Sequence, residues 1–207
     1  MTRPAGRSAS QEMDAARDDV NELASRNADA AALCASDRHK EAIPLFARTL
    51  ADCRAILGTE HVGTLTVGGN LAVACVVAGR KREGITLMVA NLADRARVLG
   101  EEDPRTLTAR DALAAAYRMT GSVDDAVELS QVVTVQRRRT LGPAHPDTLT
   151  SRMGLALAQA AAGAVESAYS GLTSAINDAE QSLGARHSHT LALLDCGRQI
   201  GLIRRTG

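Results

Sequence analysis

The strongest constraint on this chain is a sequence repeat with a period of 42 residues. A Leu-Gly pair marks each period, and a Thr-Leu pair begins seven residues after its leucine. Four matching occurrences at one spacing indicate stacked structural units, since one unit of this length cannot bury its own apolar face. The pairs are Leu57-Gly58, Leu99-Gly100, Leu141-Gly142 and Leu183-Gly184, followed by Thr64-Leu65, Thr106-Leu107, Thr148-Leu149 and Thr190-Leu191.

Each repeat predicts two helices joined by a tight turn. Asp103 and His145 each precede a proline, which suits a helix N-cap followed by proline at the first helical position. The first helix ends at a glycine such as Gly121, which can adopt the left-handed conformation of a C-cap. A column of small residues lets the two helices of a hairpin approach closely. The column is Ala42, Gly84, Ala126 and Ala168.

The pattern predicts an all-α protein, an α-solenoid of stacked antiparallel helix hairpins. We expect residues 1–12 to be disordered and residues 13–207 to form a single array. The hairpins are expected at about 18–56, 61–98, 103–140 and 145–182, with a capping helix at about 187–205.

Charge and composition argue against nucleic-acid and membrane binding. The sequence has 24 Lys and Arg against 24 Asp and Glu, so the net charge is zero, and aromatic side chains are scarce. This removes the long-range attraction of a nucleic-acid or anionic-membrane binder, and no run is long enough to span a membrane. The basic run at 137–139 is interpreted as a solvated helix face.

The four cysteines indicate a reduced protein. Cys34, Cys53, Cys75 and Cys196 form no CxxC pair and lie within apolar helical patterns, so we interpret them as buried small hydrophobic residues. The N-terminal segment contains no apolar run that could serve as a signal peptide, so we expect a cytoplasmic protein.

No motif predicts catalysis, a cofactor or a metal. His61, His145 and His187 share one repeat position, so stacking separates them by one helix-packing distance of about 8–10 Å or more, whereas zinc needs each ligand at about 2.0–2.1 Å from one ion. We interpret them as helix-start residues, and we expect His187 and His189 to point in different directions. The sequence offers no nucleophile with a base and no phosphate-binding glycine loop. We therefore expect no enzyme activity.

Three segments carry a family resemblance. LGPAHPDTLTSRMGLALAQAAAG at 141–163, LGEEDPRTLTARDALAAAYRMTG at 99–121 and HKEAIPLFARTL at 39–50 resemble tetratricopeptide repeats of the kinesin light chain type. The resemblance covers about residues 30–195. It implies a right-handed superhelix whose first helices line a concave groove, and a scaffold that binds peptides or partner proteins there.

Alignment with this family predicts the residues that face the groove. Only Asn70 retains a family asparagine suited to binding a peptide backbone through side-chain hydrogen bonds. The predicted groove residues are Thr66, Gly69, Asn70, Val73, Thr108, Asp111, Ala115, Arg118, Thr150, Met153 and Leu157.

Two alternatives remain open. The chain could be a regulatory or oligomerisation subunit of a separately encoded signalling ATPase or transcriptional regulator, or a homo-oligomer, through an apolar end containing Tyr169, Leu172 and Ile176. It could also be an enzyme whose site no motif reveals.

Overall fold

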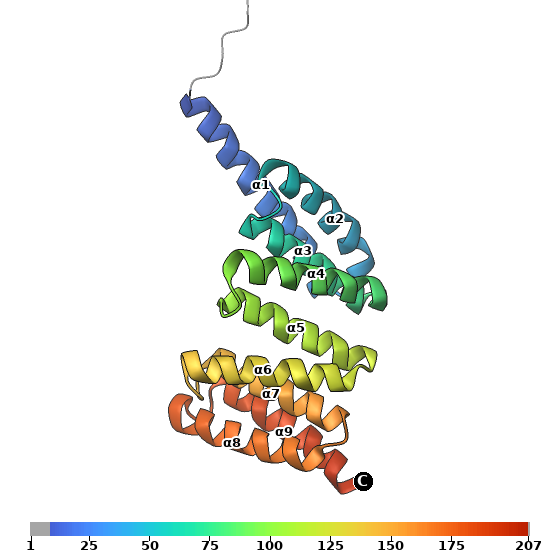
Figure 1. Ribbon diagram of the computed structural model, residues 1–207, viewed down its shortest axis with the longest axis vertical. Helices are drawn as coiled ribbons and strands as arrows, with labels where there is room; N and C mark the ends of the chain where they lie inside the picture. The colour runs from blue at the N-terminus through green and yellow to red at the C-terminus, as the bar shows by residue number, and fades with distance from the viewer. Residues whose placement is uncertain (1–8, 207) are drawn as a thin grey trace, which may run out of the picture. The chain divides into compact units, whose positions relative to one another are not determined.

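The computed structural model describes residues 9–206, with side chains described for residues 17–201. Over residues 9–206 the chain forms nine α-helices and no β-strand (Figure 1). The helices are α1 (Ala9–Ala35), α2 (His39–Ile56), α3 (Val62–Val77), α4 (Lys81–Leu99), α5 (Pro104–Thr120), α6 (Val123–Leu141), α7 (Pro146–Ala161), α8 (Val165–Leu183) and α9 (Ser188–Thr206).

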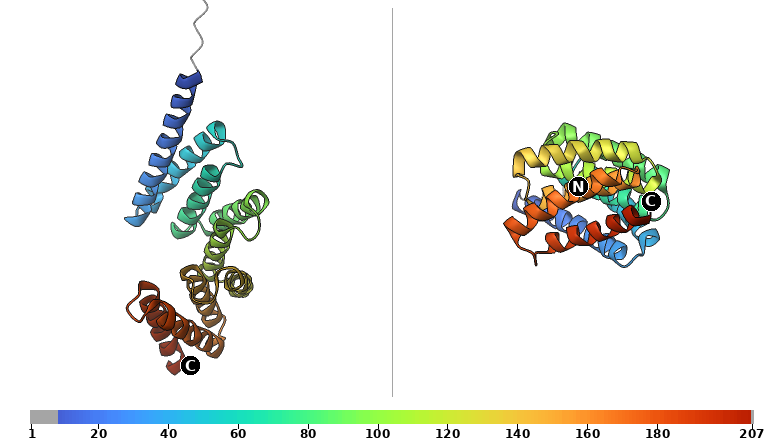
Figure 2. Two further views of the ribbon diagram at one scale, coloured as in Figure 1. Left: turned by 90° about the vertical axis from the view of Figure 1, so that its left-hand side faces the viewer. Right: turned by 90° about the horizontal axis from the view of Figure 1, so that it is seen from below.

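The chain divides into two compact units, unit 1 ending at Asp94 and unit 2 beginning at Arg95. Within unit 1, α1 packs on α2 and α2 on α3; within unit 2, each helix from α5 to α9 packs on the next (Figures 1 and 2). Within each unit, the first helix of a hairpin, here called the A helix, also contacts the next A helix: α1 contacts α3 in unit 1, and α5 contacts α7 in unit 2. This is the packing of an α-solenoid, so the predicted fold class is confirmed.

The predicted signals mark the helix boundaries. Asp103 Oδ1 accepts a hydrogen bond of 2.8 Å from the backbone N–H of Arg105, and His145 Nδ1 accepts one of 3.2 Å from Asp147. Gly121 ends α5 in the left-handed region, with φ of 93°. At the same repeat position in the first hairpin stands Asp37, with φ of 59°, a conformation that aspartate tolerates better than most residues.

The N-terminal helix begins earlier than the sequence predicts. Residues 9–12 belong to α1, although we expected 1–12 to be disordered and the first hairpin to begin near residue 18. Residues 1–8 lie outside the described residues. That 13–207 forms one array stays a prediction.

Aliphatic side chains fill both cores. In unit 1 they surround Phe46, and in unit 2 the cluster includes Leu149, Leu172 and Leu193. Leu172 is only 1% exposed because α9 packs against α8. The expected apolar end is therefore wrong for Leu172, and Ile176 also packs against the same cluster. Tyr169 remains 38% exposed. Among the described residues, no helix is both long and apolar enough to cross a membrane.

Candidate peptide-binding faces

The predicted groove residues lie on three A helices that belong to two units. Those on α3 are in unit 1, and those on α5 and α7 are in unit 2. We therefore describe two faces, the α3 face and the α5–α7 face. The α3 face has Thr66, Gly69, Asn70 and Val73; the α5–α7 face has Thr108, Asp111, Ala115, Arg118, Thr150, Met153 and Leu157.

On the α3 face, Asn70 contacts the preceding A helix. Its Nδ2 donates a hydrogen bond of 3.0 Å to Oδ1 of Asn27 on α1. Thr66 Oγ1 donates to the carbonyl of Val62 one turn earlier, at 2.8 Å, while Val73 is exposed. The amide of Asn70 thus joins two helices, and its carbonyl oxygen and second N–H are the groups with which it could meet a peptide.

On the α5–α7 face, Asp111 belongs to a polar network centred on Arg137 of α6. Arg137 Nη1 lies 2.8 Å from Asp111 Oδ2 and donates to the Asp147 carbonyl at 2.9 Å. Arg137 Nη2 donates to Thr108 Oγ1 at 2.9 Å. The hydroxyl of Ser151 on α7 donates to Asp111 Oδ2 at 2.8 Å. The network joins three consecutive helices.

This network corrects the interpretation of the basic run. Arg137 is only 3% exposed, whereas Arg138 and Arg139 are exposed as expected for a solvated face. Because Arg137 is enclosed and paired with a carboxylate, it is not available to contact a nucleic acid.

Burial raises the pKa of Asp111 above its ordinary value. The charge of Arg137 and the hydrogen bond from Ser151 oppose this effect, and the charge of Asp147 adds to it. Desolvation disfavours the ionised form and is the largest of these causes. The network therefore holds the carboxylate of Asp111 at a position where burial disfavours its negative charge.

The exposed side chains of the α5–α7 face are small and uncharged. Thr108, Ala115 and Thr150 are exposed, and each threonine hydroxyl donates to a carbonyl of its own helix one turn earlier. Met153 and Leu157 are half-buried and pack against the core cluster of unit 2. Arg118 of α5 lies close enough to Cys196 of α9 to lower its pKa, although burial raises that pKa more.

The histidines serve as helix-start residues, as predicted. Nδ1 of His61, His145 and His187 each accepts a hydrogen bond from a backbone N–H two residues later. The rings of His187 and His189 stack with centroids 5.4 Å apart, so the expectation that they point in different directions is wrong. Across the described residues, no group of three or more His, Cys, Asp or Glu side chains could hold a metal ion.

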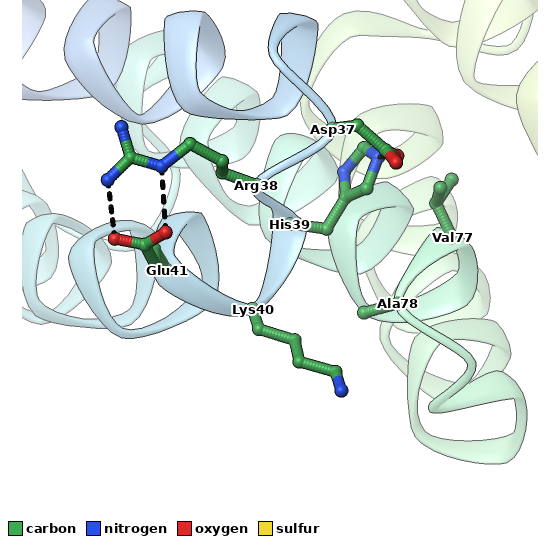
Figure 3. A pocket seen from close by; sticks show the side chains of 7 residues that line it. All are labelled: Asp37, Arg38, His39, Lys40, Glu41, Val77 and Ala78. Carbon is green, nitrogen blue, oxygen red and sulfur yellow. Dashed lines mark hydrogen bonds and ion pairs between the residues drawn. The ribbon is translucent and has the colours of Figure 1, made fainter.

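A pocket of about 400 Å³ lies in unit 1, where the turn between α1 and α2 meets the end of α3 (Figure 3). Arg38 donates to both oxygens of Glu41, at 2.7 and 2.6 Å, and His39 Nε2 lies 3.2 Å from Asp37 Oδ1. Lys40 extends away from these pairs (Figure 3). Arg38 and Glu41 are paired with each other, and His39 with Asp37, so we assign this pocket no ligand.

Sequence reasoning missed a second pocket in unit 1, of about 310 Å³, between α3 and α4. It lies beside Gly68, at a repeat position where three other A helices carry arginine. This exchange of arginine for glycine is visible in the sequence and was the signal that could have located the pocket.

Comparisons with known proteins agree with this fold. The tetratricopeptide repeat family model matches residues 23–63 and 106–147. Two solved structures show nearly identical TPR-like repeats from a Podosopora anserina protein assigned as a kinesin light chain, each 28% identical to this chain. One, a Gln-to-Met variant, has a TM-score of 0.78 and covers 89% of this chain and 87% of its own. The other has a TM-score of 0.77, with 89% and 88% covered.

A third structure, BtubC (BKLC) from P. vanneervenii, is 16% identical, with a TM-score of 0.61 over 88% of this chain and 64% of its own. At that identity it shows the fold alone. No curated protein matches the sequence.

The fold and these matches define an array of tetratricopeptide repeats. The repeats of this chain are similar to those of kinesin light chain-like proteins, which confirms the resemblance seen in the sequence. Repeats of this class generally serve as scaffolds for protein–protein interaction.

Proposed function

We propose that the chain is a non-catalytic scaffold that binds a segment of another protein on the α5–α7 face. The observation that carries the proposal is the contact between two successive A helices, α5 and α7, whose exposed residues include Thr108 and Ala115 on α5 and Thr150 on α7. Small exposed side chains let a peptide backbone approach closely. The flanking half-buried Met153 and Leu157 supply apolar surface for its side chains.

The buried network beneath this face supports a rigid binding surface. Arg137 joins α5, α6 and α7 through Asp111, Thr108 and the Asp147 carbonyl. A fixed helix spacing lowers the entropic cost of binding, because less has to be ordered when the ligand arrives. A cytoplasmic location is part of the proposal, since the four cysteines are unpaired thiols, as in reducing compartments.

The test is selection of peptides from a random library displayed on phage, against the purified full chain. Enriched peptides are then measured against a double variant, Ala115→Arg with Thr150→Arg, which adds bulk and charge at two exposed positions. The matched control is Val135→Arg on α6, a position that is 66% exposed. All three proteins are checked for helix content and melting temperature.

We expect peptides that bind the wild type and the Val135→Arg control but bind the double variant at least about tenfold more weakly, a loss of about 1.4 kcal/mol. Equal binding to all three proteins would move the interaction away from this face. Failure to enrich any peptide would contradict the proposal.

A further inference from the structure

The second hairpin lacks an arginine that the other three hairpins share. Arg26, Arg110 and Arg152 occupy one repeat position on α1, α5 and α7, and the same position on α3 is Gly68. In the three hairpins that have the arginine, the residue 26 positions later, on the second helix of the hairpin, accepts a hydrogen bond from it. This position is Asp52, Asp94, Gln136 or Asp178 in successive hairpins.

The last full hairpin shows what this arginine contacts. Arg152 Nη1 donates to Asp178 Oδ2 at 2.6 Å and to the Pro143 carbonyl at 3.0 Å. Arg152 Nη2 donates to the Ser174 hydroxyl at 3.0 Å. The guanidinium is therefore held by an acceptor 26 residues later and by a carbonyl nine residues earlier.

The third hairpin repeats both contacts, and the first hairpin repeats the contact with the residue 26 positions later. Arg110 Nη1 donates to Gln136 Oε1 at 3.0 Å and to the Glu101 carbonyl at 3.4 Å, and the arginine also pairs with the Glu101 carboxylate. Arg26 Nη1 donates to Asp52 Oδ2 at 2.6 Å. The acceptor 26 residues later is thus common to all three arginines.

In the second hairpin both acceptor positions line the pocket of about 310 Å³. Asp94 lies 26 residues after Gly68, and Thr59 lies nine residues before it. The pocket thus occupies the place of the missing arginine, and all of its lining residues belong to unit 1. They are Leu50, Arg54, Thr59, Thr64, Leu65, Gly68, Asn91 and Asp94.

The lining suits an arginine side chain that enters from solvent. Leu50 and Leu65 are buried and form an apolar floor, whereas Thr59 and Asp94 are exposed. An arginine side chain has the same division between an apolar stem and a charged planar end. A carboxylate accepts several hydrogen bonds, so Asp94 can accept from a guanidinium in addition to any hydrogen bond that it already accepts.

We propose that this pocket binds an arginine side chain of a partner protein, which supplies the guanidinium that Gly68 leaves out. The site is separate from the α5–α7 face and does not depend on the function proposed for it. Arginine is favoured over lysine because a planar guanidinium can donate to a carboxylate and a carbonyl together, as Arg152 does with Asp178 and Pro143.

Two neighbouring side chains bear on the affinity. Arg54, an exposed residue, is the cation among the lining residues, and its charge opposes a second guanidinium. Asn91 Nδ2 donates to the Leu65 carbonyl at 2.9 Å and lies 3.0 Å from where a Cβ on Gly68 would be. Asn91 therefore leaves little room for a side chain at position 68. In the last full hairpin, where the arginine is present, the residue equivalent to Asn91 is the smaller Ala175.

The experiment is an NMR titration of the full chain with N-acetyl-arginine methylamide, with the lysine analogue as the comparison. We expect saturable shifts in the backbone amides of Gly68, Asn91 and Thr59, with a dissociation constant of roughly 1–10 mM for so small a probe. The lysine analogue should bind several-fold more weakly. Equal shifts from both analogues, or no shift at these amides, would overturn the proposal.

Variants assign the binding to this pocket. Asp94→Asn should weaken arginine binding by about tenfold or more, and Arg54→Ala should strengthen it. The exposed carboxylate of Asp124 in unit 2 supplies the matched control, because Asp124→Asn should change nothing. If Asp94→Asn binds as well as the wild type, the proposal is wrong.

A self-filled variant provides a second, independent test. Gly68→Arg with Asn91→Ala recreates the arrangement of the last full hairpin, so it should raise the melting temperature and abolish binding of the probe. Continued binding by a folded double variant would contradict the proposal. The Ala115→Arg and Thr150→Arg changes on the α5–α7 face should leave probe binding unchanged, so the two proposals can fail separately.

Discussion

Arg152 Nη1 lies 2.6 Å from Asp178 Oδ2, so an ion pair joins α7 to α8. The side chain of Arg152 is only 6% exposed and that of Asp178 is 34% exposed. Because the arginine also donates to the Pro143 carbonyl and the Ser174 hydroxyl, it links both helices of the hairpin to the loop before them.

Removing this arginine should destabilise unit 2. We expect Arg152→Met to lower the free energy of unfolding by about 1–3 kcal/mol, because three acceptors lose a charged donor. Urea denaturation followed by circular dichroism measures the change. The control is Arg198→Met, which breaks an exposed pair with Asp195 and should cost less than about 1 kcal/mol. Similar losses in both variants would show that burial adds nothing to the Arg152 interaction.

Asp111 should titrate above its ordinary pKa, because burial raises the pKa of this carboxyl. NMR of the side-chain carboxyl carbon measures it directly. Ser151→Ala should raise the pKa further by removing a hydrogen bond to the ionised form, and Arg137→Met should raise it more by removing the neighbouring positive charge. A lower pKa in either variant would contradict the network described here.

The stability of the fold should depend on pH through the same group. The folded-state pKa of Asp111 is raised, so its protonated form contributes stability that is fully present below the unfolded value. That contribution is lost as pH rises through the folded-state pKa. Relative to Asp111→Asn, the wild type should therefore lose stability as pH rises from the ordinary aspartate pKa. Urea unfolding at a series of acidic pH values measures this, and the opposite slope would refute the prediction.

Gly84→Ala should destabilise the second hairpin by about 1–3 kcal/mol, because its new methyl group has no room. A Cβ on Gly84 would lie 2.7 Å from the Val76 backbone nitrogen and 2.8 Å from the Ala72 carbonyl oxygen. Gly171→Ala on α8 is the matched control, since no atom apart from its chain neighbours and the backbone of its own helix lies within 4 Å of a Cβ at this position. The free energy of unfolding of this control should rise by up to about 1 kcal/mol, because alanine has a higher helix propensity than glycine. Thermal unfolding compares the two, and a neutral Gly84→Ala would show that α3 and α4 can separate.

The four cysteines should react with iodoacetamide in a fixed order. Burial raises the pKa of each thiol, which lowers the fraction of reactive thiolate. Cys34 is half-buried while Cys53, Cys75 and Cys196 are buried, so Cys34 should be modified first. Mass spectrometry after timed labelling measures the order, with complete labelling in denaturant as the control. Faster modification of any buried cysteine would contradict the described packing.

Much of the fold was predictable because its signals are local. The caps at Asp103 and His145 and the left-handed glycine at Gly121 depend on backbone groups a few residues away, which the sequence displays directly. The repeat period then implies that one hairpin stacks on the next, since its apolar face needs a cover. The all-α solenoid class followed from these features without any long-range contact.

The tertiary structure decided which charged and apolar side chains are enclosed. Arg137 and Arg138 are neighbours in one basic run, yet only Arg137 is buried, because its helix turns it toward Asp111 and Ser151. Leu172 was expected at an exposed end but is covered by α9.

The sequence by itself determined the helices, their order and their repeat, because capping, turn formation and apolar periodicity act over a few residues. The pocket beside Gly68 emerged only when Thr59 and Asp94, 35 residues apart in sequence, were brought together around it. Whether a side chain is paired, enclosed or left facing a pocket depends on groups that folding brings from distant parts of the chain. That is why the Arg137 network and the pocket beside Gly68 required the tertiary structure.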